Sequence, residues 1–325
     1  MKRSIRRIRQ QQMSGPALPN HRQEIEFQEE FTKTFNGEDF LLYDSGTEEN
    51  RILIFSTRRY LQLLSQSDHW YADGTFKTVP LLFNQLYTIH GLKEDASVPL
   101  VYALLSNRTK ETYKHLLRQL KVLQPVLSPR TITVDFEKPM ITVLRNEFPD
   151  ARLRGCFFHF TQCILRAINS KGLKQRYDTD VEFALKLRIL PAVAFVPTES
   201  VVEVFETLCE NEILPPEAQE VVDYFEDTWI GRLHRRERRP PQFDLAMWNL
   251  YQSILEDLPK TNNSVEGWHR GFAERVGAMH PNIWKFINYI KKEQSLNEIR
   301  IEQYVSGFEH QPQKRKYREL KKNRV

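Results

Sequence analysis

The order in which strand-like and helix-like patterns follow one another restricts the fold of this chain more than any other feature. Short apolar and β-branched runs dominate its first third, and polar or turn-forming stretches separate the later ones. These runs are Ile52–Phe55, His69–Pro80, Gln85–Gly91 and Val98–Ser106. The last three follow one another closely enough to predict an antiparallel meander.

Alternating helix and strand patterns come next. The predicted elements are a helix over Lys110–Gln124, a strand over Thr131–Asp135, a helix over Pro139–Phe148, a strand over Arg152–Phe160 and a helix over Thr161–Asn169. A meander followed by strand-helix units predicts an α/β fold, in which helices flank a mixed sheet as in ribonuclease H-like proteins.

The helical pattern then continues without a comparable strand, which predicts a division into five segments. Residues 1–38 would be a basic arm and linker, and 39–178 the first part of the α/β core. Residues 179–257 would form an all-helical insertion, and 258–306 the last helix of the core. Residues 307–325 are polar and basic, which predicts a disordered tail.

Positive charge is concentrated at the two ends of the chain and in one internal cluster. The net charge of +5 comprises +5 in residues 1–12 and +6 in residues 313–325, so the 300 residues between carry −6. The internal cluster consists of Arg232, Arg235, Arg236, Arg238 and Arg239. Such clusters suit phosphate backbones or nuclear import receptors, although each basic end alone is as well explained as a solubilising tail. Together they favour a nuclear protein that contacts nucleic acid.

Cysteine content and hydropathy indicate an intracellular protein. The longest apolar runs are far shorter than the roughly 18 residues of a membrane helix. The charged N-terminus is not followed by the apolar segment of a secretory signal. Three cysteines in a long chain argue against a disulfide framework and for a reducing compartment. We therefore expect no membrane-spanning segment and a location in the nucleus or cytosol.

Two aspartates fall in or at the end of predicted strands. Asp73 interrupts an otherwise apolar strand, where a buried carboxylate is costly unless it is paired or binds a cation. Asp135 ends the strand Thr131–Asp135, and acids at such strand ends face the ligand crevice of open α/β sheets. Structural alternatives remain: Asp73-Gly74 would suit a hairpin turn, and Asp135 would suit a helix cap.

Glu266 is a third candidate, with a strong structural alternative. Asn263 as N-cap and Glu266 at the third helical position would form a capping box, in which the glutamate only bonds a backbone N–H. Spacing alone favours this capping interpretation over catalysis.

Two further groups of residues are candidates for binding. Cys156, His159 and Cys163 would supply three zinc ligands, but no fourth cysteine or histidine lies nearby in the sequence. We therefore expect Cys156 and His159 to pack near the end of the strand Arg152–Phe160, with His159 within reach of the catalytic cleft or the DNA end. Trp268, two residues from Glu266, is a candidate for DNA stacking, with core packing as its alternative.

Four sequence segments together resemble one family. DHWYADGTFKTVP, TITVDFEKPM, CFFH and TNNSVEGWHRGF occur in the order and with the long spacers of the Mutator-like (MULE) transposase domain. This domain is a member of the DDE transposase group and has a ribonuclease H-like fold. The resemblance covers roughly Asp39 to Gln303, and CFFH looks like the family's CxxH motif.

The resemblance implies a metal-dependent enzyme acting on DNA. Asp73, Asp135 and Glu266 match the three acids that would bind two Mg²⁺ or Mn²⁺ ions for cleavage and strand transfer of DNA phosphodiesters. Double-stranded DNA and other copies of the chain are the implied partners. The sequence lacks the Cys/His pairs of the N-terminal zinc-binding module common in this family. A catalytically silent, host-captured nuclear protein that binds DNA or other proteins therefore stays an alternative.

Overall fold

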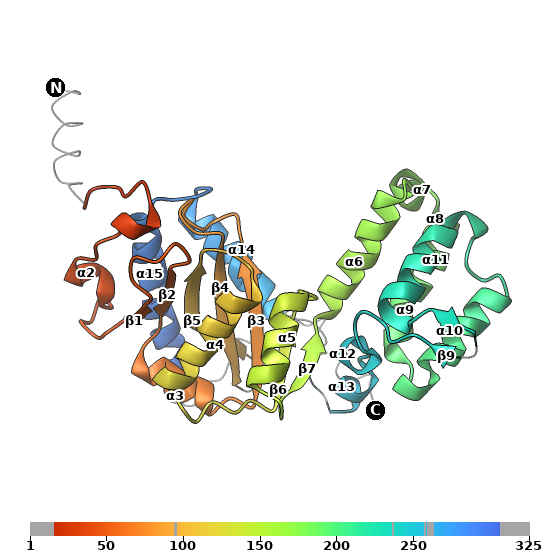
Figure 1. Ribbon diagram of the computed structural model, residues 1–325, viewed down its shortest axis with the longest axis horizontal. Helices are drawn as coiled ribbons and strands as arrows, with labels where there is room; N and C mark the ends of the chain where they lie inside the picture. Colours follow the sequence, from red (N-terminus) through yellow and green to blue (C-terminus); the bar gives the residue numbers. More distant parts are fainter. Residues whose placement is uncertain (1–15, 94–95, 236, 257, 259–262, 306–325) are drawn as a thin grey trace, which may run out of the picture.

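A seven-stranded mixed sheet forms the centre of the molecule (Figure 1). The computed structural model describes residues 16–93, 96–235, 237–256, 258 and 263–305. The strand order is β1-β2-β5-β4-β3-β6-β7. The strands are β1 Leu41–Asp44, β2 Ile52–Phe55, β3 His69–Thr75, β4 Gln85–Lys93, β5 Ala96–Leu105, β6 Thr131–Val134 and β7 Arg152–Gly155. The pairs β3–β6 and β6–β7 are parallel and the others antiparallel, which confirms the predicted mixed α/β sheet.

Helices cover both faces of this sheet. On one face lie α4 (Lys110–Leu123) and α5 (Lys138–Glu147), whose buried residues join those of alternate strand positions in one hydrophobic cluster. On the other face lie α14 (Asn263–Val276) and α15 (Ile283–Val305), which form a second cluster with strand residues such as Leu86. The sheet therefore has two apolar faces, as parallel central strands require.

Several element boundaries differ from the sequence prediction. β3 ends at Thr75, five residues before the predicted end. The strand predicted over Arg152–Phe160 was wrong in its second half, because β7 ends at Gly155 and α6 begins at Phe157. Buried residues at Phe160, Ile164, Ala167 and Ile168 follow helical spacing, and this apolar stripe favours the helix. β1 and the helix α3 (Arg58–Ser65) were not predicted.

A second group of helices, which we call the helical lobe, lies beyond the edge strand β7. In Figure 1, α6 (Phe157–Ser170) leads away from the sheet into this lobe. It contains α7 Lys174–Thr179, α8 Val181–Leu187, α9 Ile189–Ala192, α10 Val201–Glu210, α11 Gln219–Phe225, α12 Leu245–Trp248 and α13 Tyr251–Leu255. Aromatic rings hold it to α6, because Phe160 stacks on Trp248 with ring centroids 5.0 Å apart.

Residues near the described N-terminus pack against the second face rather than acting only as a linker. η1 (Arg22–Glu24) and α2 (Glu29–Thr32) precede β1. Phe31 is buried against Trp284 of α15, with ring centroids 4.7 Å apart. This contact was not predicted, because its partner lies more than 250 residues away in the sequence.

No helix in the described parts of the chain is both long enough and apolar enough to cross a membrane.

The first prediction concerns the junction between the sheet and the helical lobe. Gly155 at the end of β7 lies under the ring of Phe136. That ring also packs edge-on against Trp229, with ring centroids 4.8 Å apart. A methyl group at position 155 would overlap that ring, so Gly155→Ala should lower the free energy of unfolding by about 1–3 kcal/mol in urea titrations.

Gly267→Ala is the matched control, because a methyl group there meets nothing within 4 Å and the residue lies inside α14. This control should leave stability unchanged or raise it by about 0.5–1 kcal/mol. Equal effects of both substitutions would contradict the assigned packing of Phe136.

Candidate active site

The two candidate aspartates lie side by side because β3 and β6 pair in parallel with a constant register. His69, Trp70 and Tyr71 oppose Thr131, Ile132 and Thr133, and the same offset places Asp73 beside Asp135. Asp73 and Gly74 pair with Thr88 and Tyr87 inside the ladder, so they form no hairpin turn. The helix after Asp135 begins at Lys138 with Glu137 at its N-cap position, so Asp135 is not that cap.

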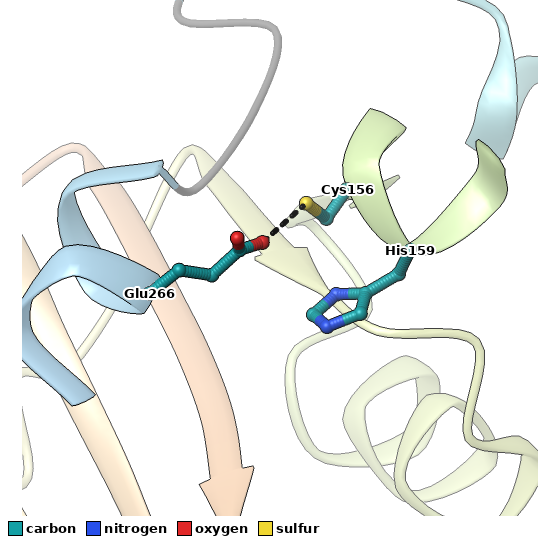
Figure 2. A group of neighbouring side chains, drawn as sticks. All are labelled: Cys156, His159 and Glu266. Atoms are coloured by element: carbon teal, nitrogen blue, oxygen red, sulfur yellow. Dashed lines mark hydrogen bonds between the residues drawn. The ribbon is translucent and has the colours of Figure 1, made fainter. Parts of the chain in front are cut away.

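Glu266 approaches the aspartates from α14, which packs against β3 and β5. Asn263 is the first residue of α14 rather than its N-cap, which places Glu266 at the fourth helical position. The predicted capping box is therefore not formed with Asn263 as the cap. The Glu266 carboxylate is instead directed at Cys156, whose thiol donates to Oε1 over 3.9 Å (Figure 2).

Burial and nearby negative charge raise the pKa of both aspartates. Burial and then the charge of Asp135 raise the pKa of Asp73 to about 8, with a smaller contribution from Glu266. The N–H of Gly74, 2.8 Å from Asp73 Oδ1, acts in the opposite direction. Burial and the charge of Glu137 raise the pKa of Asp135 to about 6, so Asp135 ionises before Asp73. A bound cation would relieve both effects.

His269 is a site residue that the sequence analysis missed. It lies one helical turn after Glu266, on the same face of α14, with Nε2 3.7 Å from Asp73 Oδ2. Burial, followed by the charge of His159, lowers the pKa of His269 to about 4. The imidazole is thus neutral near pH 7, and the contact with Asp73 is not an ion pair. The i, i+3 spacing from Glu266 was the only sequence signal for it.

Glu137, two residues after Asp135, is held in place by hydrogen bonds from two other side chains. Arg108 donates two hydrogen bonds to its carboxylate, at 3.1 and 2.8 Å, and the Tyr113 hydroxyl donates a third at 2.9 Å. A forked arginine pair of this kind fixes the orientation of the carboxylate. The loop after β6, which carries Asp135, is therefore tied to α4.

Cys156 and His159 also belong to this site. They are the N-cap and the third residue of α6, which begins two residues after the end of β7, so both lie near the end of that strand. Burial and the charge of Arg166 lower the pKa of His159 to about 4. Within the described parts of the chain, one group of three side chains could hold a metal ion, because their ligand atoms lie within 4.8 Å of one another. Its members are Cys156, His159 and Glu266. The third member is not Cys163, which the sequence offered.

Trp268 lies in the core next to the site. It is 8% exposed, stacks on Phe272 with ring centroids 5.0 Å apart, and donates from Nε1 to Glu293 over 3.0 Å. These contacts favour its packing alternative over DNA stacking.

The arginine cluster lies on and beside a small hairpin of the helical lobe, formed by β8 (Leu233–His234) and β9 (Glu237–Arg238). Acidic neighbours engage part of it: Arg232 is 2.9 Å from Asp227, and Arg238 is 2.8 Å from Glu206. The remaining members that the structure describes, Arg235 and Arg239, are exposed, and Arg236 lies outside the described residues.

Comparison with known families agrees with the resemblance found in the sequence. The family model of the MULE transposase domain matches residues 69–163, from β3 into α6. The match includes Asp73, Asp135, Cys156 and His159, and it ends before Glu266. The match confirms the resemblance to the MULE transposase domain that the sequence motifs indicated.

A similar solved structure is the Drosophila P element transposase strand transfer complex, with 13% identity and a TM-score of 0.37. The similarity covers 72% of this chain and 79% of that one. Curated protein sequences gave no match.

The second prediction concerns the pH dependence of stability without divalent ions. An unfolded aspartate ionises near 3.8, whereas Asp73 in the fold ionises near 8. Between these pH values the folded protein binds more protons, so stability falls as pH rises. Asp73→Asn should remove most of this loss. The difference in free energy of unfolding between the variant and wild type should therefore be a few kcal/mol more in favour of the variant at pH 8 than at pH 4.5, measured with a chelator present.

Asp150→Asn, the same chemical change at an exposed turn after α5, is the control and should keep the wild-type pH dependence. If the stability of Asp73→Asn kept the wild-type dependence on pH, the pKa of Asp73 would not be raised in the folded protein.

Proposed function

We propose that this chain is a DDE-type transposase of the Mutator-like class, which cleaves and transfers DNA strands with two divalent cations. The proposal rests on the register of β3 with β6, which brings Asp73 and Asp135 together. Glu266 is close enough to contribute to the raised pKa of Asp73. The family match over residues 69–163 supports DNA as the substrate class. The alternation of meander and strand-helix units supports a ribonuclease H-like core, with the helical lobe as an insertion before Glu266.

The donors of this site fit Mg²⁺ or Mn²⁺. Asp73, Asp135 and Glu266 offer carboxylate oxygens, which are the ligands that hard cations prefer. The raised pKa values of the two aspartates indicate that buried negative charge lacks compensation within the protein. Bound there, two ions would activate the attacking water or 3′-hydroxyl and stabilise the leaving oxygen.

The chain's own residues position these carboxylates. The central strands β3 and β6 fix Asp73 and Asp135, since movement of either would break the ladder on both sides of β3. Glu266 sits on a separate helix, so its distance from the aspartates depends on how α14 packs. We further propose a nuclear location and an assembly of several copies on DNA, supported by the basic ends of the chain and the family match.

The third prediction tests the enzyme directly. Asp135→Asn should lower Mn²⁺-dependent nicking of supercoiled DNA by at least about 100-fold, because the amide carries no charge with which to hold a cation. Asp150→Asn should nick at the wild-type rate. Mn²⁺ should also raise the melting temperature of wild type, and this rise should be absent in Asp135→Asn.

Two outcomes would overturn the enzyme proposal. One is equal nicking by wild type and Asp135→Asn. The other is no nicking and no strand transfer by wild type, which would favour the alternative of a captured, non-cutting DNA-binding or protein-interaction module.

The fourth prediction concerns the arginine cluster. Arg235 and Arg239 are exposed on the helical lobe, so we propose that they contact DNA phosphates. Their joint replacement by glutamate should weaken DNA binding and reduce the slope of log affinity against log salt by about 2, since each lost phosphate contact removes about 0.9. Replacing exposed Arg58 on α3 by glutamate is the control. An unchanged slope in the double variant would remove this role.

A further inference from the structure

The Cys156-x-x-His159 motif is not used by the proposed DNA chemistry, yet it faces one of the proposed catalytic acids. Cys156 precedes the first turn of α6 and His159 ends that turn, so their side chains leave the helix on the same side. Glu266 comes from α14, 110 residues after Cys156 in the chain. Figure 2 shows the three side chains turned toward one another across the gap between the two helices.

We propose that Cys156, His159 and Glu266 form a binding site for Zn²⁺ or a similar borderline transition-metal ion. One sulfur, one imidazole nitrogen and one carboxylate oxygen lie within 4.8 Å of one another. Tetrahedral zinc, with bonds of about 2.0–2.3 Å, separates its ligand atoms by about 3.3–3.8 Å. Cys156 Sγ and Glu266 Oε1 are already 3.9 Å apart, so small side-chain movements complete the geometry.

The surroundings of these donors support a ligand at this point. His159 Nδ1 is buried and has no hydrogen-bond partner among the described residues. A buried ring nitrogen without a partner destabilises the fold, and a metal ion bound by this nitrogen would remove that cost. Cys156 is fully buried, and α6 begins directly after it. The positive end of the helix dipole favours an anionic sulfur at this position.

The donor set separates this site from that of the aspartates. Thiolate and imidazole ligands favour Zn²⁺ over Mg²⁺, which requires oxygen ligands. Three protein ligands leave a fourth position for water or a substrate atom, as in catalytic rather than structural zinc sites. On binding, the Cys156 thiol gives its proton to solvent and the thiolate bonds to the metal.

Glu266 would belong to both sites. When it binds the softer ion, its carboxylate is withdrawn from Asp73 and Asp135. Excess Zn²⁺ should therefore inhibit Mn²⁺-dependent nicking, a consequence that rests on the proposed function. The binding of the metal itself does not rest on it, because it needs neither DNA nor cleavage.

The fifth prediction uses Co²⁺ as a spectroscopic probe in the full chain. The chain has three cysteines, so Cys163→Ser/Cys209→Ser leaves Cys156 as its single thiol. Titration of this double variant with Co²⁺ should give a thiolate-to-cobalt charge-transfer band that saturates at one equivalent, and Zn²⁺ should abolish the band by displacing the cobalt. Adding Cys156→Ser should remove the band, although serine can still donate a hydrogen bond to Glu266.

Affinity measurements complete the test. His159→Ala and Glu266→Gln should each weaken Zn²⁺ binding by at least about 10-fold in competition with a chromogenic chelator. Asp135→Asn should bind Zn²⁺ like wild type while losing nicking, which separates failure of this site from failure of the proposed enzyme. Thermal melting of each variant confirms that it is folded.

Three results would overturn the proposal: no saturable Co²⁺ band in wild type, a band that survives Cys156→Ser in the folded variant, or unchanged Zn²⁺ affinity in both His159→Ala and Glu266→Gln.

Discussion

The parallel pairing of β3 with β6 is the constraint on which the candidate site depends. Its register places two carboxyl groups side by side in the sheet, where Asp73 is only 6% exposed. Burial and repulsion then raise both pKa values, so the fold holds acidic groups that it does not itself neutralise. Such an arrangement is destabilising without a cation, which is the reason to interpret it as functional rather than structural.

Glu266 is controlled by a different part of the fold. It is carried by α14, whose packing on the sheet depends on rings such as Trp268 and Phe272 in the second hydrophobic cluster. The same glutamate is close enough to Asp73 to contribute to its raised pKa, and Cys156 and His159 at the start of α6 face it. Its position between hard and soft donors makes it the residue through which two kinds of metal ion would compete.

Much of the sheet could be predicted because its signals are local. The runs Ile52–Phe55 and Thr131–Val134 are short, apolar and β-branched, and both are strands. Predictions failed where contacts distant in sequence decide the structure. The start of α6 was placed too late in the chain, because Phe160 belongs to the buried stripe of that helix through its stacking on the distant Trp248. Phe31 and Trp284 meet for the same reason.

The sequence by itself determined which residue types were available: one acid within a strand, another at the end of a strand, a third in the first turn of a helix, and a Cys-x-x-His pair. It could not decide whether each acid forms a turn, caps a helix or binds a ligand, because the neighbouring residues in the sequence are compatible with each role. Tertiary structure decided this by excluding the turn at Asp73 and the cap at Asp135, and by directing Glu266 toward Cys156. The physical reason is that β-register and helix packing set distances between groups that the chain separates by 62 to 193 positions, as between Asp73 and Asp135 and between Asp73 and Glu266.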